Sequence, residues 1–125
     1  RAYHITPEGI FQISRDHSVV ENMVAKGDLT PLEARTHPNR NLITRALGPD
    51  IHAKADTFEL PWHKDEFLLL CSDGLVNTVS DQEMLFEVLH DGDVNECLDH
   101  LLQISLQRGA PDNITAVLLL NEEGR

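Results

Sequence analysis

The sequence predicts an α+β fold built in layers, in which strands and helices are grouped and do not strictly alternate. β-prone runs and amphipathic stripes with helix-capping residues each occur in groups, and turns rich in Gly and Pro separate them. The expected order is two strands, two helices, three strands, two helices and a strand. Such grouping favours an α+β arrangement over a doubly wound parallel sheet.

Two segments near the start of the chain form a predicted hairpin. They span residues 2–5 and 10–14, and the four residues between them include Pro7 and Gly9. Proline and glycine in so short a gap favour a turn between antiparallel strands.

Two short helices are expected next, each opened by a capping residue. Ser18 and Glu21 have the spacing of a capping box, which satisfies backbone N–H groups at a helix start, and Gly27 is the expected stop. Thr30 caps a second helix that opens with a proline. Pro38 keeps that helix short, because the residue before a proline avoids helical geometry.

Three strands are expected in the middle of the chain. Residues 42–47 are expected to be extended, residues 54–60 alternate loosely in polarity, and residues 61–66 form a predicted turn. Residues 67–71 form a continuous apolar run. Such a run is typical of a strand that is buried on both faces.

Two further helices and a final strand complete the predicted order. Ser80 and Glu83 form a third capping-box pattern, and Asp93 caps the last helix, which ends at Gly109. Residues 114–120 are nearly all apolar and form the last predicted strand.

Composition narrows the class of protein. The chain has 125 residues, of which 41% are hydrophobic, and a formal net charge of −11. These values fit one globular domain and argue against nucleic-acid binding, which needs a basic surface. No apolar run is long enough for a membrane span, and no secretory leader is visible. Cys71 and Cys97 are expected to be buried thiols in a reducing cytoplasm.

Two acidic residues stand apart from the rest by their position. Asp73, followed by Gly74, comes directly after a buried strand, and Asp112, followed by Asn113, comes directly before another. If these strands are antiparallel neighbours, both carboxylates lie at the same edge of the sheet. Paired carboxylates repel each other unless a cation holds both ionised, and Mg²⁺ or Mn²⁺ is the natural candidate.

Other interpretations of these side chains remain open. An Asp beside a strand is more often a turn former, and two carboxylates rarely complete a catalytic metal cluster, so further ligands must come from elsewhere. The seven histidines show no clustering of the zinc type. Arg40 and Arg45 have the planar donors that grip phosphate, although pairing with the abundant carboxylates is the simpler role.

Several short motifs occur along the chain in a fixed order. They are RAY at residues 1–3, DHS at 16–18, HPNRNLITRALG at 37–48, LLLCSDGL at 68–75 and DNIT at 112–115. The last two resemble signature motifs of the 2C-type metal-dependent serine/threonine protein phosphatases, and residues 1–3 resemble the end of that family's Gly-Asp-Ser-Arg motif. Residues 16–18 and 37–48 resemble segments typical of its bacterial branch. The whole chain therefore resembles the bacterial branch of this family.

The resemblance implies part of a four-layer α-β-β-α sandwich with antiparallel sheets. It also implies hydrolysis of phosphoserine and phosphothreonine in proteins, by water activated at two or three Mn²⁺ or Mg²⁺ ions. By motif, Asp73 and Asp112 are implied to be metal ligands. Asn113 and Gly74 are implied to position these ligands without contacting the metal themselves. Arg40 and Asn41 fall in the flap beside the substrate cleft. Phosphorylated proteins are the implied substrates. The resemblance also implies a serine/threonine kinase that phosphorylates the proteins from which the phosphatase removes phosphate.

The same resemblance implies that residues 1–125 are the C-terminal portion of a single catalytic domain. The motifs of the family's N-terminal half are absent, and the chain opens without Met. We therefore expect a fragment that is inactive alone, lies in the cytoplasm and associates with itself or a partner through uncovered apolar faces. The alternatives are a non-catalytic regulatory or interaction module of the same fold, and an unrelated small α+β binding domain.

Overall fold

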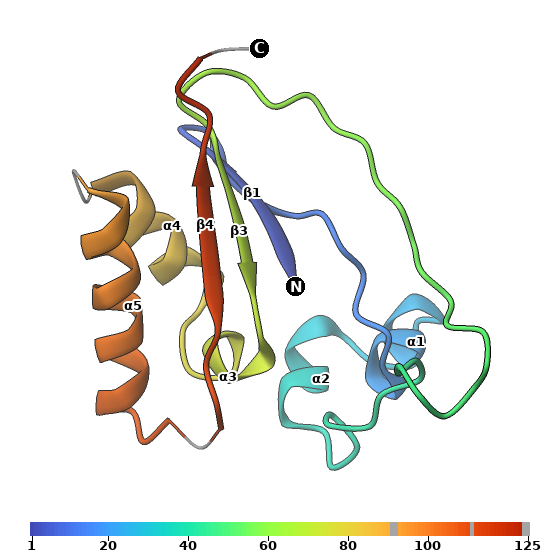
Figure 1. Ribbon diagram of the computed structural model, residues 1–125. Coiled ribbons are helices and arrows are strands. Elements are labelled where there is room, and N and C mark those ends of the chain that lie inside the picture. Colours follow the sequence, from blue (N-terminus) through green and yellow to red (C-terminus); the bar gives the residue numbers. More distant parts are fainter. Residues whose placement is uncertain (91–92, 111, 124–125) are drawn as a thin grey trace. The chain divides into compact units, whose positions relative to one another are not determined.

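A four-stranded antiparallel sheet forms the centre of one of the two units into which the computed structural model divides (Figure 1). The structure describes residues 1–90, 93–110 and 112–123. The sheet unit contains residues 1–14 and the chain from Glu59 onward, and the second unit comprises Arg15–Phe58.

The strands of the sheet are β1 (Ala2–Thr6), β2 (Gly9–Gln12), β3 (Phe67–Cys71) and β4 (Ala116–Leu120). They lie in the order β2-β1-β3-β4, and all neighbours are antiparallel. The predicted hairpin is confirmed as β1 and β2. The two most apolar runs of the sequence, β3 and β4, are direct neighbours.

Three helices belong to the sheet unit, namely α3 (Asp73–Val76), α4 (Asp81–His90) and α5 (Val94–Gln107). The capping box predicted for α4 is confirmed, because the backbone N–H and the side chain of Ser80 both bond to Glu83. The Asp93 carboxylate accepts from the N–H of Asn95 and so caps α5. No sequence pattern predicted α3, which is only four residues long.

The core lies between α4, α5 and one face of the sheet (Figure 1). Tyr3 and Leu69 on the strands are fully buried, as are Met84 on α4 and Leu101 on α5. Because side chains alternate along a strand, the intervening residues face the opposite side of the sheet. That side is exposed and largely apolar, and its most accessible residues are Phe11, Leu70, Val117 and Leu119.

Tyr3 also joins the sheet to the start of α4. Its hydroxyl donates to Oδ1 of Asp81 at 3.1 Å and accepts from Nη1 of Arg1 at 3.1 Å. Burial raises the pKa of Tyr3 to about 12. The phenol therefore stays neutral and acts as a donor at ordinary pH.

The second unit contains α1 (Val19–Ala25) and α2 (Pro31–Thr36), as predicted. Ser18 caps α1 through its hydroxyl, and the complete capping box of α2 is formed by Thr30 and Glu33. An isolated antiparallel bridge between Ser18 and Ile43 joins the start of α1 to the following loop.

The two predicted strands at 42–47 and 54–60 are wrong. The first segment makes only the bridge at Ile43, and the second forms no strand. Most of their side chains are exposed, including Leu47 and Phe58, so neither segment has a buried face to stabilise it. Apolar residues alone do not make a strand where no partner strand offers its backbone groups.

Cys71 and Cys97 are both buried and are not joined by a disulfide bond. No helix in the described residues is both long enough and apolar enough to cross a bilayer.

Candidate functional site

The candidate site lies where β3 ends and β4 begins, at the end of the sheet next to α3 (Figure 1). Cys71 and Ala116 form the last pair of Cα partners between the two strands. Ser72 extends this pairing, because its N–H donates to the Thr115 carbonyl at 2.9 Å and its Oγ accepts from the Thr115 N–H at 3.0 Å. The segments that follow β3 and precede β4 are therefore held side by side.

Gly74 makes the closest approach between these segments possible. A Cβ added to Gly74 would lie 2.1 Å from the backbone oxygen of Asn113, well inside contact distance. Gly74 is buried in the first turn of α3, so the requirement for glycine here is one of space. Asp73 and Asp112 are the chain neighbours of these two residues, and the approach keeps both acidic residues at one end of the sheet.

The prediction that the two acidic residues flank antiparallel neighbouring strands is confirmed. Both Asp73 and Asp112 are exposed. Oδ1 of Asp112 accepts from the N–H of Asn113 at 2.7 Å, which fixes the orientation of that carboxylate. Carboxylate oxygens are among the ligands that Mg²⁺ and Mn²⁺ prefer, and both of these carboxylates are accessible.

The two carboxylates do not amount to a complete centre. Within the described part of the chain, no group of three or more His, Cys, Asp or Glu side chains is arranged to hold a metal ion. Because Mg²⁺ takes six ligands in octahedral geometry, a site built on Asp73 and Asp112 needs water or ligands from another segment.

Arg40 and Asn41, the predicted flap residues, lie in the second unit. Both are exposed in the loop that follows α2. Nη1 of Arg40 donates to the carbonyl of His37 at 3.1 Å, so the guanidinium is partly engaged by its own loop.

The second unit also contains an ion cluster that no sequence pattern predicted. Oδ2 of Asp56 lies 2.9 Å from Nε2 of His17, and Oδ1 of Asp56 accepts from Nη1 of Arg45 at 2.8 Å. The hydrogen bonds from Arg45 and His17 lower the pKa of Asp56 to about 2. Pairing of Arg45 with a carboxylate was predicted, but no local pattern marks Asp56, which is 39 residues from His17.

The chain is similar in sequence and in fold to bacterial serine/threonine phosphatases. The phosphatase stp of Listeria monocytogenes is 34% identical to this chain over 128 residues, which cover all of this chain and 51% of the Listeria protein. The crystal structure of phosphatase Stp1 from Staphylococcus aureus matches with a TM-score of 0.88 and 40% identity, over 99% of this chain and 48% of the other. No protein-family profile matches the chain.

A metal-bound structure is also among the matches. The catalytic domain of the phosphatase PstP in complex with two manganese ions matches with a TM-score of 0.77 and 34% identity, over 94% of this chain and 48% of the other. The fold and the comparisons define the class: the chain is a homologue of the bacterial PPM, or 2C-type, serine/threonine phosphatases. It spans about half the length of the Listeria protein. The predicted α+β sandwich fold is thereby confirmed.

Proposed function

We propose that this chain supplies one end of the metal-binding catalytic centre of a Mn²⁺- or Mg²⁺-dependent protein phosphatase. In this proposal Asp73 and Asp112 hold the metal cluster, which contains two or three ions in the complete enzyme. The observation that carries the proposal is the approach of Gly74 to Asn113, which leaves the two neighbouring carboxylates at one end of the sheet. Manganese in the PstP homologue supports the choice of ion.

Each residue of the proposed site has a defined task. Asn113 orients the Asp112 carboxylate through its N–H, and Gly74 leaves room for the backbone that carries Asp112. The chemistry that bound divalent ions supply is activation of water and neutralisation of charge on a phosphoryl group. Arg40 and Asn41 are proposed to meet the substrate from the flap, where a guanidinium suits phosphate.

The substrates of the complete enzyme are proposed to be proteins that carry phosphoserine or phosphothreonine. A serine/threonine kinase would produce them, and a cytoplasmic location would suit two buried thiols that form no disulfide. We further propose that residues 1–125 form the C-terminal portion of the catalytic domain and are inactive alone. Two observations on the described residues support this part of the proposal. Asp73 and Asp112 are too few ligands for a complete metal site, and one face of the sheet is left uncovered.

The test compares metal binding and phosphate release in two proteins, this chain and a complete parent that contains it. Mn²⁺ binding is measured by calorimetry, and phosphate release is measured with a phosphothreonine peptide. The parent is expected to show both, and Asp73→Asn and Asp112→Asn in the parent are expected to lose both. Asp99→Asn, an exposed position on α5, is the matched control and should change neither.

The outcomes separate the alternatives. A parent that folds but binds no Mn²⁺ would instead support a non-catalytic interaction module of the same fold. Phosphate release by the 125-residue chain, if abolished by Asp73→Asn, would contradict the proposal that the missing half is required.

A further inference from the structure

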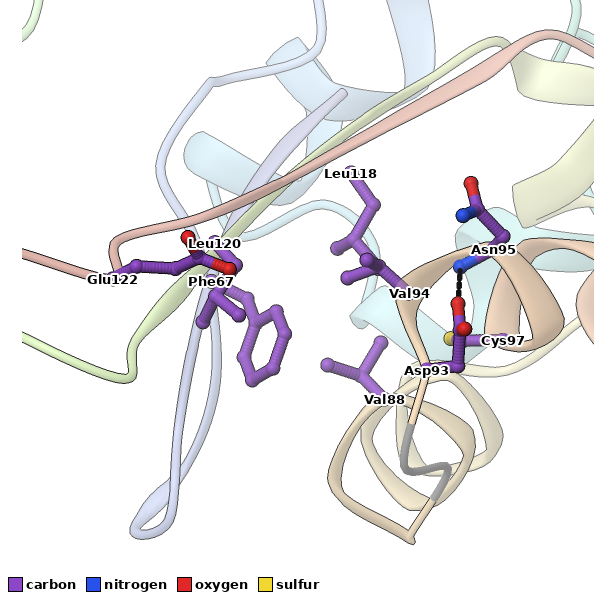
Figure 2. A pocket seen from close by; sticks show the side chains of 9 residues that line it. All are labelled: Phe67, Val88, Asp93, Val94, Asn95, Cys97, Leu118, Leu120 and Glu122. Atoms are coloured by element: carbon purple, nitrogen blue, oxygen red, sulfur yellow. Dashed lines mark hydrogen bonds between the residues drawn. The ribbon is translucent and has the colours of Figure 1, made fainter.

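A cavity of about 300 Å³ lies in the sheet unit, between the sheet and the helices α4 and α5. Its apolar wall comes from Phe67 and Leu120 on the strands and from Val88 on α4. Figure 2 shows Phe67 and Val88 pointing toward one another, with Glu122 on the strand side and Asp93 on the helix side. The accessible surface of the cavity is about equally polar and apolar, with Asp93, Asn95 and Glu122 beside the apolar side chains.

The cavity is separate from the candidate metal site. Phe67 is the first residue of β3 and Leu120 is the last residue of β4. Asp73 follows the other end of β3, and six residues of extended chain span roughly 20 Å. A molecule in the cavity would therefore not touch the carboxylates proposed to bind metal.

The charged side chains that line the cavity determine which charge a bound ligand would carry. The Asp93 carboxylate is held in place because it accepts from the N–H of Asn95 at 2.7 Å (Figure 2). Glu122 is exposed, and no described residue bonds to its carboxylate. The described lining contains no Lys, Arg or His, and the whole chain carries a formal charge of −11. The Asp93 carboxylate is offset by the positive N-terminal end of α5, which it caps. The uncompensated carboxylate is Glu122, beside which a cation is favoured and an anion is repelled.

We propose that this cavity binds a small organic ammonium compound, with its apolar body against Phe67, Val88 and Leu120 and its charged nitrogen beside Glu122. A cavity of ~150 Å³ is enough for benzene, so this volume accommodates an aromatic ring with a short aminoalkyl chain. Contact with the apolar side chains stabilises the apolar body by removing it from water, and the Glu122 carboxylate selects a positively charged group.

The test is a titration of the ¹⁵N-labelled chain, followed by two-dimensional amide NMR spectra. The probes are 2-phenylethylamine, neutral 2-phenylethanol and anionic phenylacetate, which share a ring and a short chain. The amine is expected to shift the amide signals of cavity residues, including Val94 and Leu118, in a saturable manner. The alcohol should bind about fivefold more weakly, since an exposed ion pair contributes little, and phenylacetate should not bind.

Two variants and one control locate the site. Glu122→Gln should weaken amine binding about fivefold and leave alcohol binding unchanged, because only the charge is removed. Val94→Trp should fill the cavity and abolish binding of both. The control is Glu96→Gln. Glu96 is an exposed glutamate on α5 that does not line the cavity, so this change should leave the affinities for amine and alcohol unchanged.

Three results would overturn the proposal: equal binding of amine and phenylacetate, shifts confined to residues outside the cavity, or unchanged amine affinity in Glu122→Gln. If Val94→Trp does not fold, Glu122→Gln still decides the matter, since it alters no packed side chain. None of these measurements uses metal or phosphatase activity, so they stand apart from the proposed function.

Discussion

Gly74 lies directly against the backbone oxygen of Asn113, so close that a Cβ on Gly74 would be 2.1 Å from that oxygen. The atom it would meet belongs to the main chain, which cannot move aside as a flexible side chain can. This contact explains why a glycine follows Asp73. It also joins the two segments proposed to carry the metal ligands.

Gly74→Ala is expected to destabilise the chain by about 3 kcal/mol, because overfilling a tightly packed position forces the backbone to shift. The measurement is urea-induced unfolding followed by circular dichroism. Gly27→Ala is the control: Gly27 has φ of +83° but open space around it, so alanine there should cost only about 1 kcal/mol of backbone strain. Equal losses in the two variants would contradict the packing argument.

A second prediction concerns the ion pair between Glu83 at the start of α4 and Arg108 at the end of α5. Nη1 and Nη2 of Arg108 donate to the two carboxylate oxygens of Glu83 at 2.9 and 2.6 Å. The hydrogen bonds from Arg108, together with those from Ser80, lower the pKa of Glu83 to about 2. An unfolded Glu titrates near ~4.3, so the folded state favours the ionised form.

Because the pKa is lowered on folding, the stability that Glu83 contributes is complete above about pH 4.3 and is lost as the pH falls toward about 2. We therefore expect wild type to exceed Glu83→Gln in unfolding free energy at pH 6, and the difference to shrink toward pH 2. The amide still accepts from Ser80, so the variant tests the charge. Glu59→Gln, in an exposed segment, should differ little from wild type across this range. A difference independent of pH would contradict the assignment.

The sequence predicted the sheet unit better than the second unit, for a physical reason. Residues 67–71 and the last strand bury one face against helices, and both were predicted as strands. The expected burial of residues 67–71 on both faces is wrong, because Leu70 is 44% exposed. Residues 42–47 and 54–60 contain apolar side chains that remain exposed, and their composition misled the strand prediction. Capping patterns were reliable because the hydroxyl and the backbone it bonds to lie within one turn.

Only those residues of the candidate site that neighbouring sequence marks could be predicted. Asp73 and Asp112 stood out because each adjoins an apolar strand, and the structure confirms that those strands are neighbours. Asp56 did not stand out, since its partners His17 and Arg45 are brought to it by the tertiary fold. The space requirement at Gly74 depends on a residue nearly forty positions away and was equally invisible.

A third prediction concerns the cluster of Asp56 with His17 and Arg45 in the second unit. This cluster ties the exposed segment 46–58 back to the start of α1. Asp56→Asn removes the negative charge to which His17 and Arg45 bond, so the segment should open more often. A protease should then cleave it several-fold faster under native conditions. The fragments are identified by mass spectrometry. Asp50→Asn, exposed in the same segment, should leave the rate unchanged, and equal rates in the two variants would show that the cluster does not restrain the segment.

The fourth prediction concerns the sheet face that α4 and α5 leave open. Leu70 on β3 and Val117 on β4 are Cα partners, and they are 44% and 47% exposed; Leu119 on the same edge strand is 42% exposed. A contiguous apolar face beside an edge strand favours association. The 125-residue chain is therefore expected to self-associate at micromolar concentration, as measured by light scattering coupled to gel filtration.

The double variant Val117→Lys, Leu119→Lys should shift this chain toward the monomer. Association would bury two lysine charges that have no carboxylate to pair with, which is unfavourable. The same two changes on the outer surface of α5, Leu102→Lys and Leu106→Lys, form the matched control, since these leucines are 41% and 58% exposed. If hydrophobicity alone drives association, both double variants will dissolve the oligomer equally. If the open sheet face drives it, only the β4 variant will do so. Under the proposed function, a longer parent that covers this face should also associate less than the 125-residue chain.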